Sequence, residues 1–191
     1  RGVDAILIPG DLFDQEGVDA GTLAFALGVF DVTGCPPVLI APGNHDPYSE
    51  RSLYWNERLL QARAMRWPAH VHVFTTPSWS HRAIPRLPGV RLWGCCFTAN
   101  VESHERPLAA AALAALPGAD PAGFDLAIFH GSREGQCPPG QNMTAPYSDD
   151  EVTSGPFAYL AVGHYHAASH LESNQGAAAG VRLAYAGSAA A

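Results

Sequence analysis

Four apolar segments of this chain each run into a glycine that stands beside a residue of the type that binds metal ions. The junctions are Gly10-Asp11, Gly43-Asn44-His45-Asp46, His130-Gly131 and Gly163-His164-Tyr165-His166. The segments themselves are residues 3–9, 37–42, 124–129 and 157–162; they are rich in Val, Ile and Leu and have the length of buried strands. Because the carboxyl ends of parallel strands form the crevice where α/β proteins bind ligands, we expect the polar residues to converge at one sheet edge.

Segments with helical character separate these strands, at residues 19–31, 52–65 and 107–116. Ser148 is expected to cap a further short helix that stops at residues 155–156. Additional strands are expected at residues 71–74, 90–97, 169–172 and 181–186, the last two joined by a turn rich in Gly, Asn and Gln. The order of elements predicts an α/β protein in which the additional strands form a second sheet packed on the first.

The composition fits one folded domain spanning residues 1–191, with nearly half of the residues apolar and no linker long enough to divide the chain. No segment approaches the ~20 apolar residues that a membrane span needs, and no signal pattern opens the chain, so we expect a cytoplasmic protein with no membrane partner. The four cysteines lack a Cys-x-x-Cys spacing and are expected to be reduced. The formal charge of -7 counts modestly against a free-standing DNA-binding protein.

The residues at the four junctions form a chemically coherent set of metal ligands. Carboxylate, amide oxygen and neutral imidazole suit Mn, Fe or Zn better than Ca, and the set lacks the thiolates typical of structural zinc. A carboxylate has two oxygens and can bridge two ions, and two ions about 3.5–4 Å apart can clamp a phosphate ester. The long segment of residues 131–147 is expected to line the active site. The pattern therefore favours phosphoryl chemistry.

Four phrases of the sequence resemble the calcineurin-like metallophosphoesterase superfamily. They are GDLFD at residues 10–14, GNHD at residues 43–46, His130, and GHYH at residues 163–166. Three longer phrases, VDAILIPGDLFD at residues 3–14, FAYLAVGHYH at residues 157–166 and VRLAYAGS at residues 181–188, resemble the SbcD-like DNA repair exonucleases within that superfamily. The resemblance implies an αββα fold, in which two mixed β-sheets pack as a sandwich flanked by helices.

The resemblance also implies a role for each matching residue. Asp11 is expected to bridge two divalent ions. One ion is expected to bind Asn44, His130 and His164, and the other His166. His45 is expected to be the catalytic histidine, which acts on the leaving oxygen and is oriented by Asp46. Mn is the expected metal, with Fe, Zn and Mg as alternatives. Asp14 is expected to cap the following loop instead of binding metal, and Ser188 matches a position without an assigned role.

One departure from the family pattern affects the second ion. The family opens with an Asp-x-His on an earlier strand, but only ten residues precede Asp11 here, and none of them is a histidine. Since the chain also begins without methionine, we expect it to be truncated at its N-terminus and to lack the first strand, with a C-terminal extension also absent; a degenerate relative is the alternative.

Three functions are compatible with these observations. The first is a nuclease acting on DNA ends with an SMC-like ATPase partner, as the resemblance implies. The second is a phosphodiesterase or phosphatase of small molecules, which the acidic charge favours. The third is a binding module without catalytic activity. We expect phosphodiester hydrolysis that depends on two metals, acting on DNA.

Overall fold

The computed structural model describes residues 2–52, 54–84, 86–114, 116, 123–140, 142–173 and 180–188. Its three-stranded sheet is parallel throughout, in the order β1 (Ile6–Ile8), β2 (Val38–Ile40) and β3 (Val71–Val73). Its six-stranded sheet has the order β4-β5-β6-β7-β9-β8. The bounds are β4 (Ser80–Ala83), β5 (Val90–Gly94), β6 (Phe124–His130), β7 (Tyr159–Gly163), β8 (Ser169–Ser173) and β9 (Gly180–Tyr185). Only β4 and β8 are antiparallel to their neighbours, and both lie at edges.

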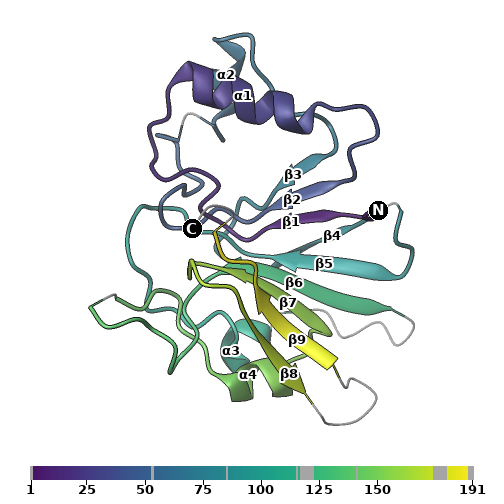
Figure 1. Ribbon diagram of the computed structural model, residues 1–191, viewed down its shortest axis with the longest axis vertical. Coiled ribbons are helices and arrows are strands. Elements are labelled where there is room, and N and C mark those ends of the chain that lie inside the picture. Colours follow the sequence, from purple (N-terminus) through teal and green to yellow (C-terminus); the bar gives the residue numbers. More distant parts are fainter. Residues whose placement is uncertain are drawn as a thin grey trace.

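Helices cover the outer face of each sheet, so the molecule has the layers of an αββα sandwich (Figure 1). Helices α1 (Ala20–Phe30) and α2 (Glu57–Gln61) lie over the three-stranded sheet, and α3 (Ala110–Leu113) and α4 (Asp149–Ser154) lie over the six-stranded sheet. The expected fold class is confirmed, although only the six-stranded sheet is mixed. Within the described ranges, no helix is long and apolar enough to cross a membrane.

Most of these strands are apolar on both faces because each face is covered by other parts of the protein. On β2, Val38 and Ile40 pack against the helices, whereas Leu39 packs between the two sheets. On β6, Ala127 and Phe129 face α3 and α4, whereas Ile128 faces the other sheet. Because successive side chains of a strand point to opposite faces, a strand covered on both sides must be apolar throughout. His130 follows this alternation, so its side chain points toward the other sheet. The candidate functional residues that follow β1 and β2 lie there.

The helix ends agree closely with the sequence where capping residues mark them. The Asp19 side chain accepts hydrogen bonds from the first turn of α1, and Asp31 follows its last residue. Ser148 and Glu151 form a capping box at the start of α4, which ends before Gly155. Helices α2 and α3 are much shorter than the predicted segments 52–65 and 107–116. Apolar composition alone therefore overestimated these two helices.

Two predictions about the sheets were wrong. Strand β3 belongs to the sheet of β1 and β2, and the four strands that carry the polar junctions are divided between two sheets. The converging residues therefore lie where two sheets meet and not at the edge of one. Strand β4, with the sequence SHRA, was not predicted because it has no apolar run. The predicted turn at residues 174–179 lies outside the described residues.

Candidate metal centre

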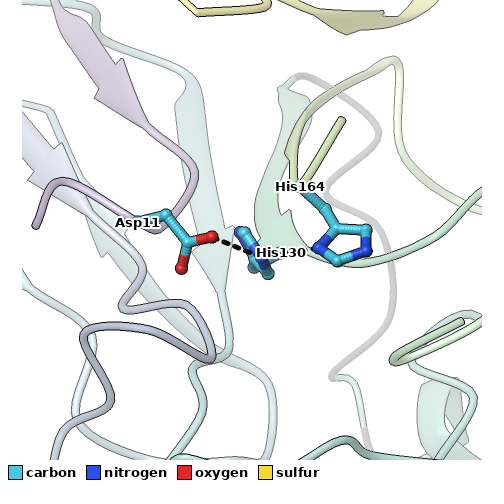
Figure 2. A group of neighbouring side chains, drawn as sticks. All are labelled: Asp11, His130 and His164. Atoms are coloured by element: carbon cyan, nitrogen blue, oxygen red, sulfur yellow. Dashed lines mark hydrogen bonds and ion pairs between the residues drawn. The ribbon is translucent and has the colours of Figure 1, made fainter. Parts of the chain in front are cut away.

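The site forms where the carboxyl ends of β1 and β2 meet those of β6 and β7. Glycines allow the segments that follow these strands to touch. A Cβ atom on Gly43 would collide with the Asp11 carboxylate, and one on Gly163 would collide with the Pro9 carbonyl. This close approach brings Asp11, His130 and His164 together, with one ligand atom of each within 4.8 Å of the others (Figure 2).

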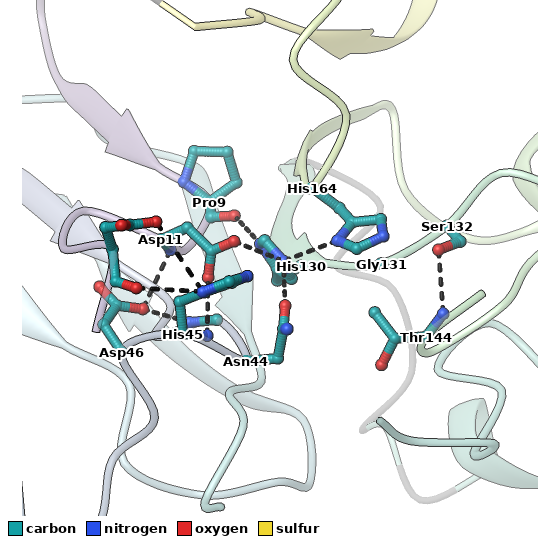
Figure 3. Close-up of polar contacts among 12 residues, drawn as sticks. Pro9, Asp11, Asn44, His45, Asp46, His130, Gly131, Ser132, Thr144 and His164 are labelled. Carbon is teal, nitrogen blue, oxygen red and sulfur yellow. Dashed lines mark hydrogen bonds and ion pairs between the residues drawn. The ribbon is translucent and has the colours of Figure 1, made fainter. Parts of the chain in front are cut away.

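Three side chains surround the Nε2 atom of His130 (Figure 3). Asn44 Oδ1 lies 2.9 Å from it, Asp11 Oδ2 lies 3.2 Å from it, and His164 Nδ1 lies 3.2 Å from it. The structure therefore brings Asp11, Asn44, His130 and His164 together. We call these four residues the inner cluster.

A contact with a backbone carbonyl fixes the orientation of the His130 ring. Its Nδ1 lies 3.0 Å from the Pro9 carbonyl oxygen, which can only accept a hydrogen bond. The Nδ1 proton is thus assigned to that bond, and in the neutral ring Nε2 presents a lone pair to the cluster. The side chain of His130 is fully buried. An imidazole held in one tautomer and one orientation is the usual form of a histidine ligand.

The inner cluster has an excess of hydrogen-bond acceptors. With the His130 tautomer fixed, a carboxylate, an amide oxygen and two imidazole nitrogens face one point, and only His164 has a ring proton to share. If His164 donates from Nδ1, its buried Nε2 is a lone pair, and that atom has no hydrogen-bond partner among the described residues. Several acceptors around one point repel each other unless a cation lies among them. The donor set therefore fits a divalent metal ion.

The pKa of His164 supports the same protonation state. Burial lowers the pKa of His164 to about 4, so its ring is neutral near pH 7. A neutral imidazole is the state in which histidine binds metals.

Two residues of the cluster have unusual backbone conformations. Asp11 has φ 52 and His164 has φ 122, both in the region that side chains other than glycine rarely adopt. Such conformations cost about 1–3 kcal/mol each and persist only where the surroundings enforce them. Their position at two ligand-type residues is what a functional site would produce.

The Asp46 carboxylate holds two loops together. It accepts hydrogen bonds from the backbone N–H groups of Asp11, Leu12, Phe13 and Gly43, at 2.7 to 3.3 Å. Burial raises its pKa to about 6 despite these bonds. No hydrogen bond joins the Asp46 carboxylate to the His45 ring among the described residues, so the expected orientation of His45 by Asp46 stays a prediction. Asp46 positions the backbone that carries Asp11.

His45 and His166 lie outside the inner cluster, and both are exposed. The His45 backbone N–H donates to Asp11 Oδ1, and the ring Nδ1 lies 3.1 Å from the Asp14 carbonyl oxygen. The Asp14 side chain is fully exposed, with Oδ1 4.0 Å from His45 Nδ1, and the predicted loop cap is not formed among the described residues. The His166 carbonyl accepts a hydrogen bond from the Ser188 N–H, which is the contact found for Ser188.

Sequence reasoning missed the residues that support the cluster. The Pro9 carbonyl is a backbone group and leaves no sequence signal. Tyr185 donates to the Gly131 carbonyl at 2.7 Å, beside His130, and its hydroxyl also contacts Tyr147. Tyr185 belongs to the VRLAYAGS phrase at residues 181–188, so the resemblance of that phrase could have indicated its supporting role. Tyr185 therefore fixes the chain directly after His130.

Comparison with protein families agrees with this geometry. The family model described as calcineurin-like phosphoesterase matches residues 1–168, a range that contains the inner cluster, His45, Asp46 and His166. No curated protein matches the chain.

Proposed function

The chain belongs to the calcineurin-like phosphoesterase family and is a metal-dependent phosphoesterase, and from this premise we propose that it hydrolyses phosphodiester bonds at DNA ends, in the manner of the SbcD-like nucleases. The observation that carries the proposal is the inner cluster, whose set of donor atoms fits a divalent cation. When bound, a divalent ion supplies a Lewis acid that polarises the oxygens of the phosphate. Mn is the proposed ion, with Fe, Zn and Mg as alternatives.

Each residue has a proposed role within this function. Asp11, Asn44, His130 and His164 would hold one ion, and Asp11 and His166 would contribute to holding a second. Exposed His45 would contact the substrate and transfer a proton to the leaving oxygen. The hydrogen bond between its Nδ1 and the Asp14 carbonyl leaves Nε2 as the atom free for that transfer. Asp46 would act by positioning the Asp11 backbone.

The distribution of charge supports a nucleic-acid substrate despite the net charge of -7. Residues 51–86 contain six of the eleven basic residues but only one acidic residue, Glu57, so this segment carries a charge of +5 and the rest of the chain -12. All six arginines are exposed, and none forms an ion pair with a described residue. They are Arg51, Arg58, Arg63, Arg66, Arg82 and Arg86. Exposed arginines are available to contact phosphates.

A phosphodiesterase of small molecules is the alternative, and the acidity of the remaining chain favours it. An SMC-like ATPase partner is proposed from the SbcD-like phrases alone. The two substrates are distinguished by comparing a linear DNA duplex with bis-p-nitrophenyl phosphate at several salt concentrations. Binding to DNA through the arginines would weaken steeply with salt, whereas hydrolysis of the small diester would not.

The function is tested by hydrolysis of bis-p-nitrophenyl phosphate with Mn²⁺ in large excess. We expect activity that EDTA abolishes; hydrolysis indifferent to chelation would contradict the proposal. The His45→Ala variant should keep the metal content but turn over roughly 10²–10⁴ times more slowly, the scale of general acid-base catalysis. Equal loss of metal and activity would identify His45 as a ligand instead.

A further inference from the structure

A large hollow adjoins the metal centre on the side of β5 and α3. Its volume is about 810 Å³, which is large enough for a nucleotide-sized group, and His130 of the inner cluster is one of the residues that line it. The strained residue Ala145, with φ 43, lines it as well, and belongs to the segment 131–147 that was expected to border the active site. His130 is thus the member of the inner cluster that borders the hollow.

The walls of the hollow are mainly apolar near His130. Phe97 is partly exposed, and its ring centroid lies 5.8 Å from that of His130. The Phe97 backbone bonds to the Pro42 carbonyl and accepts from the Tyr48 N–H, so it is attached to the loop that carries Asn44. A fixed aromatic ring beside a metal ligand offers a surface on which a flat group can stack.

The charged residues of the hollow disfavour a second phosphate. Among the described residues that line it, Arg106 is the only cationic one besides histidine, and this side chain is held by Glu134 at 2.6 Å and Glu151 at 2.7 Å. Glu102 and Glu105 bring the formal charge of the lining to -1. Since an anionic wall without an available cation repels phosphate, the hollow suits a neutral group and not a continuing sugar-phosphate backbone.

We propose that this hollow binds the nucleoside attached to the scissile phosphate, with its base beside Phe97. The inference rests on the proposed phosphodiester hydrolysis and specifies its substrate: one uncharged nucleoside lies on the α3 side of the metal centre, while further phosphates lie elsewhere. The shared ligand chemistry is a nucleoside phosphate, either at a DNA end or in a small nucleotide.

Binding is measured by calorimetry on the Mn²⁺-loaded chain with thymidine 5′-monophosphate, 2-deoxyribose 5-phosphate and methyl phosphate. The three ligands have the same phosphate group and differ in base and sugar. Stacking of one base contributes about 1–3 kcal/mol, so we expect thymidine 5′-monophosphate to bind roughly fivefold to 150-fold more tightly than the other two. Equal affinity for thymidine 5′-monophosphate and the sugar phosphate would overturn the inference.

The location is tested with two matched variants, one on α3 and one directly after it. Ala112 lies on α3, is exposed and lines the hollow, so Ala112→Trp should fill the hollow and remove the preference for the nucleotide without changing affinity for methyl phosphate. Ala114 directly follows α3, is exposed and does not line the hollow, so Ala114→Trp should keep the preference. Equal effects of the two changes would contradict the assignment. Phe97→Leu gives a second, independent test and should lower nucleotide affinity roughly fivefold or more.

Failure of this inference and failure of the proposed function give different results. If no phosphate ligand binds and no phosphodiester is hydrolysed, the proposed function is wrong. If methyl phosphate binds and bis-p-nitrophenyl phosphate is hydrolysed, but no ligand with a base is preferred, only the nucleoside site is wrong. A linear DNA duplex and a dinucleotide then distinguish the two sources. If the hollow binds DNA ends, the Ala112→Trp variant should lose hydrolysis of both substrates. If it binds small nucleotides, the variant should lose hydrolysis of the dinucleotide alone.

Discussion

The two ends of β6 each carry a buried ionisable side chain, and they differ in their partners. At the start of the strand, Asp125 faces donors: Arg91 Nε and Nη2 both lie 2.7 Å from its oxygens, and Trp93 Nε1 lies 2.8 Å away. At the end of the strand, His130 faces acceptors from Asp11, Asn44 and His164. A buried charge with matched donors is satisfied by the protein, whereas a group of acceptors is suited to bind a cation.

The difference separates structural from functional polar residues within one strand. Both positions are buried and both are polar, so burial and residue type do not distinguish them. Asp46 belongs with Asp125 by this criterion, because four backbone N–H groups surround its carboxylate. The motif GNHD therefore contains residues of different kinds: a ligand-type Asn44, an exposed His45 and a structural Asp46.

The largest expected effect is on metal affinity. His130→Ala removes the central residue of the inner cluster and should weaken Mn²⁺ binding roughly 10²–10³-fold, since structural Zn²⁺ sites with four ligands bind with about 10–16 kcal/mol, or about 2.5–4 kcal/mol for each ligand. Asp125→Asn changes the other end of the strand and should leave the affinity unchanged. Isothermal calorimetry of the two variants measures both. Similar affinities in the two variants would remove the distinction between the strand ends.

A smaller effect is expected on stability when Asp46 is changed. Asp46→Asn places an NH₂ group against backbone N–H donors, so the free energy of unfolding should fall by about 2–3 kcal/mol. Asp14→Asn is the matched control, because this exposed side chain should change stability by less than about 0.5 kcal/mol. Urea denaturation without metal gives both values. If the Asp46 variant were as stable as the Asp14 variant, Asp46 would not be a structural residue.

The smallest effect is the pH dependence of the Asp125 ion pair. Burial opposes ionisation of Asp125, but the hydrogen bonds from Arg91 and Trp93 and the charge of Arg91 lower its pKa overall. The Asp125 carboxyl group thus binds its proton less tightly in the folded chain than in the unfolded chain. The stabilisation is present above the unfolded pKa of about 3.9 and is lost as pH falls through the folded pKa. The stability difference between the natural chain and Asp125→Asn, about 1 kcal/mol at pH 7, should shrink below about pH 4. A constant difference between pH 7 and pH 3 would show that the ion pair does not cause it.

Much of the fold could be predicted from local sequence. Residues 37–42, 90–97, 124–129 and 157–162 all contain strands of the structure, and Asp19 and Ser148 cap helices as expected. The division of the strands between two sheets could not be predicted, because an apolar run is the same whether one sheet or two contain it. The edge strand β4 was missed since its side chains are mostly exposed and need not be apolar.

The inner cluster could be predicted because each of its residues follows a strand directly. The role of Asp46 could not, because its partners are backbone groups supplied by residues more than thirty positions earlier, as well as by Gly43. The excess of arginine in residues 51–86 can be counted in the sequence, but the negative net charge of the whole chain does not reveal it. The position of these arginines on an exposed surface required the structure.

The most direct test of the metal centre is a crystal of the chain grown with Mn²⁺ and examined for anomalous scattering. We predict one strong peak bonded to Asp11, Asn44, His130 and His164, and little density beside His166, because two protein ligands rarely hold a divalent ion against water. A peak elsewhere in the chain, or two full peaks with ligands other than these, would contradict the assignment of the inner cluster as the metal site.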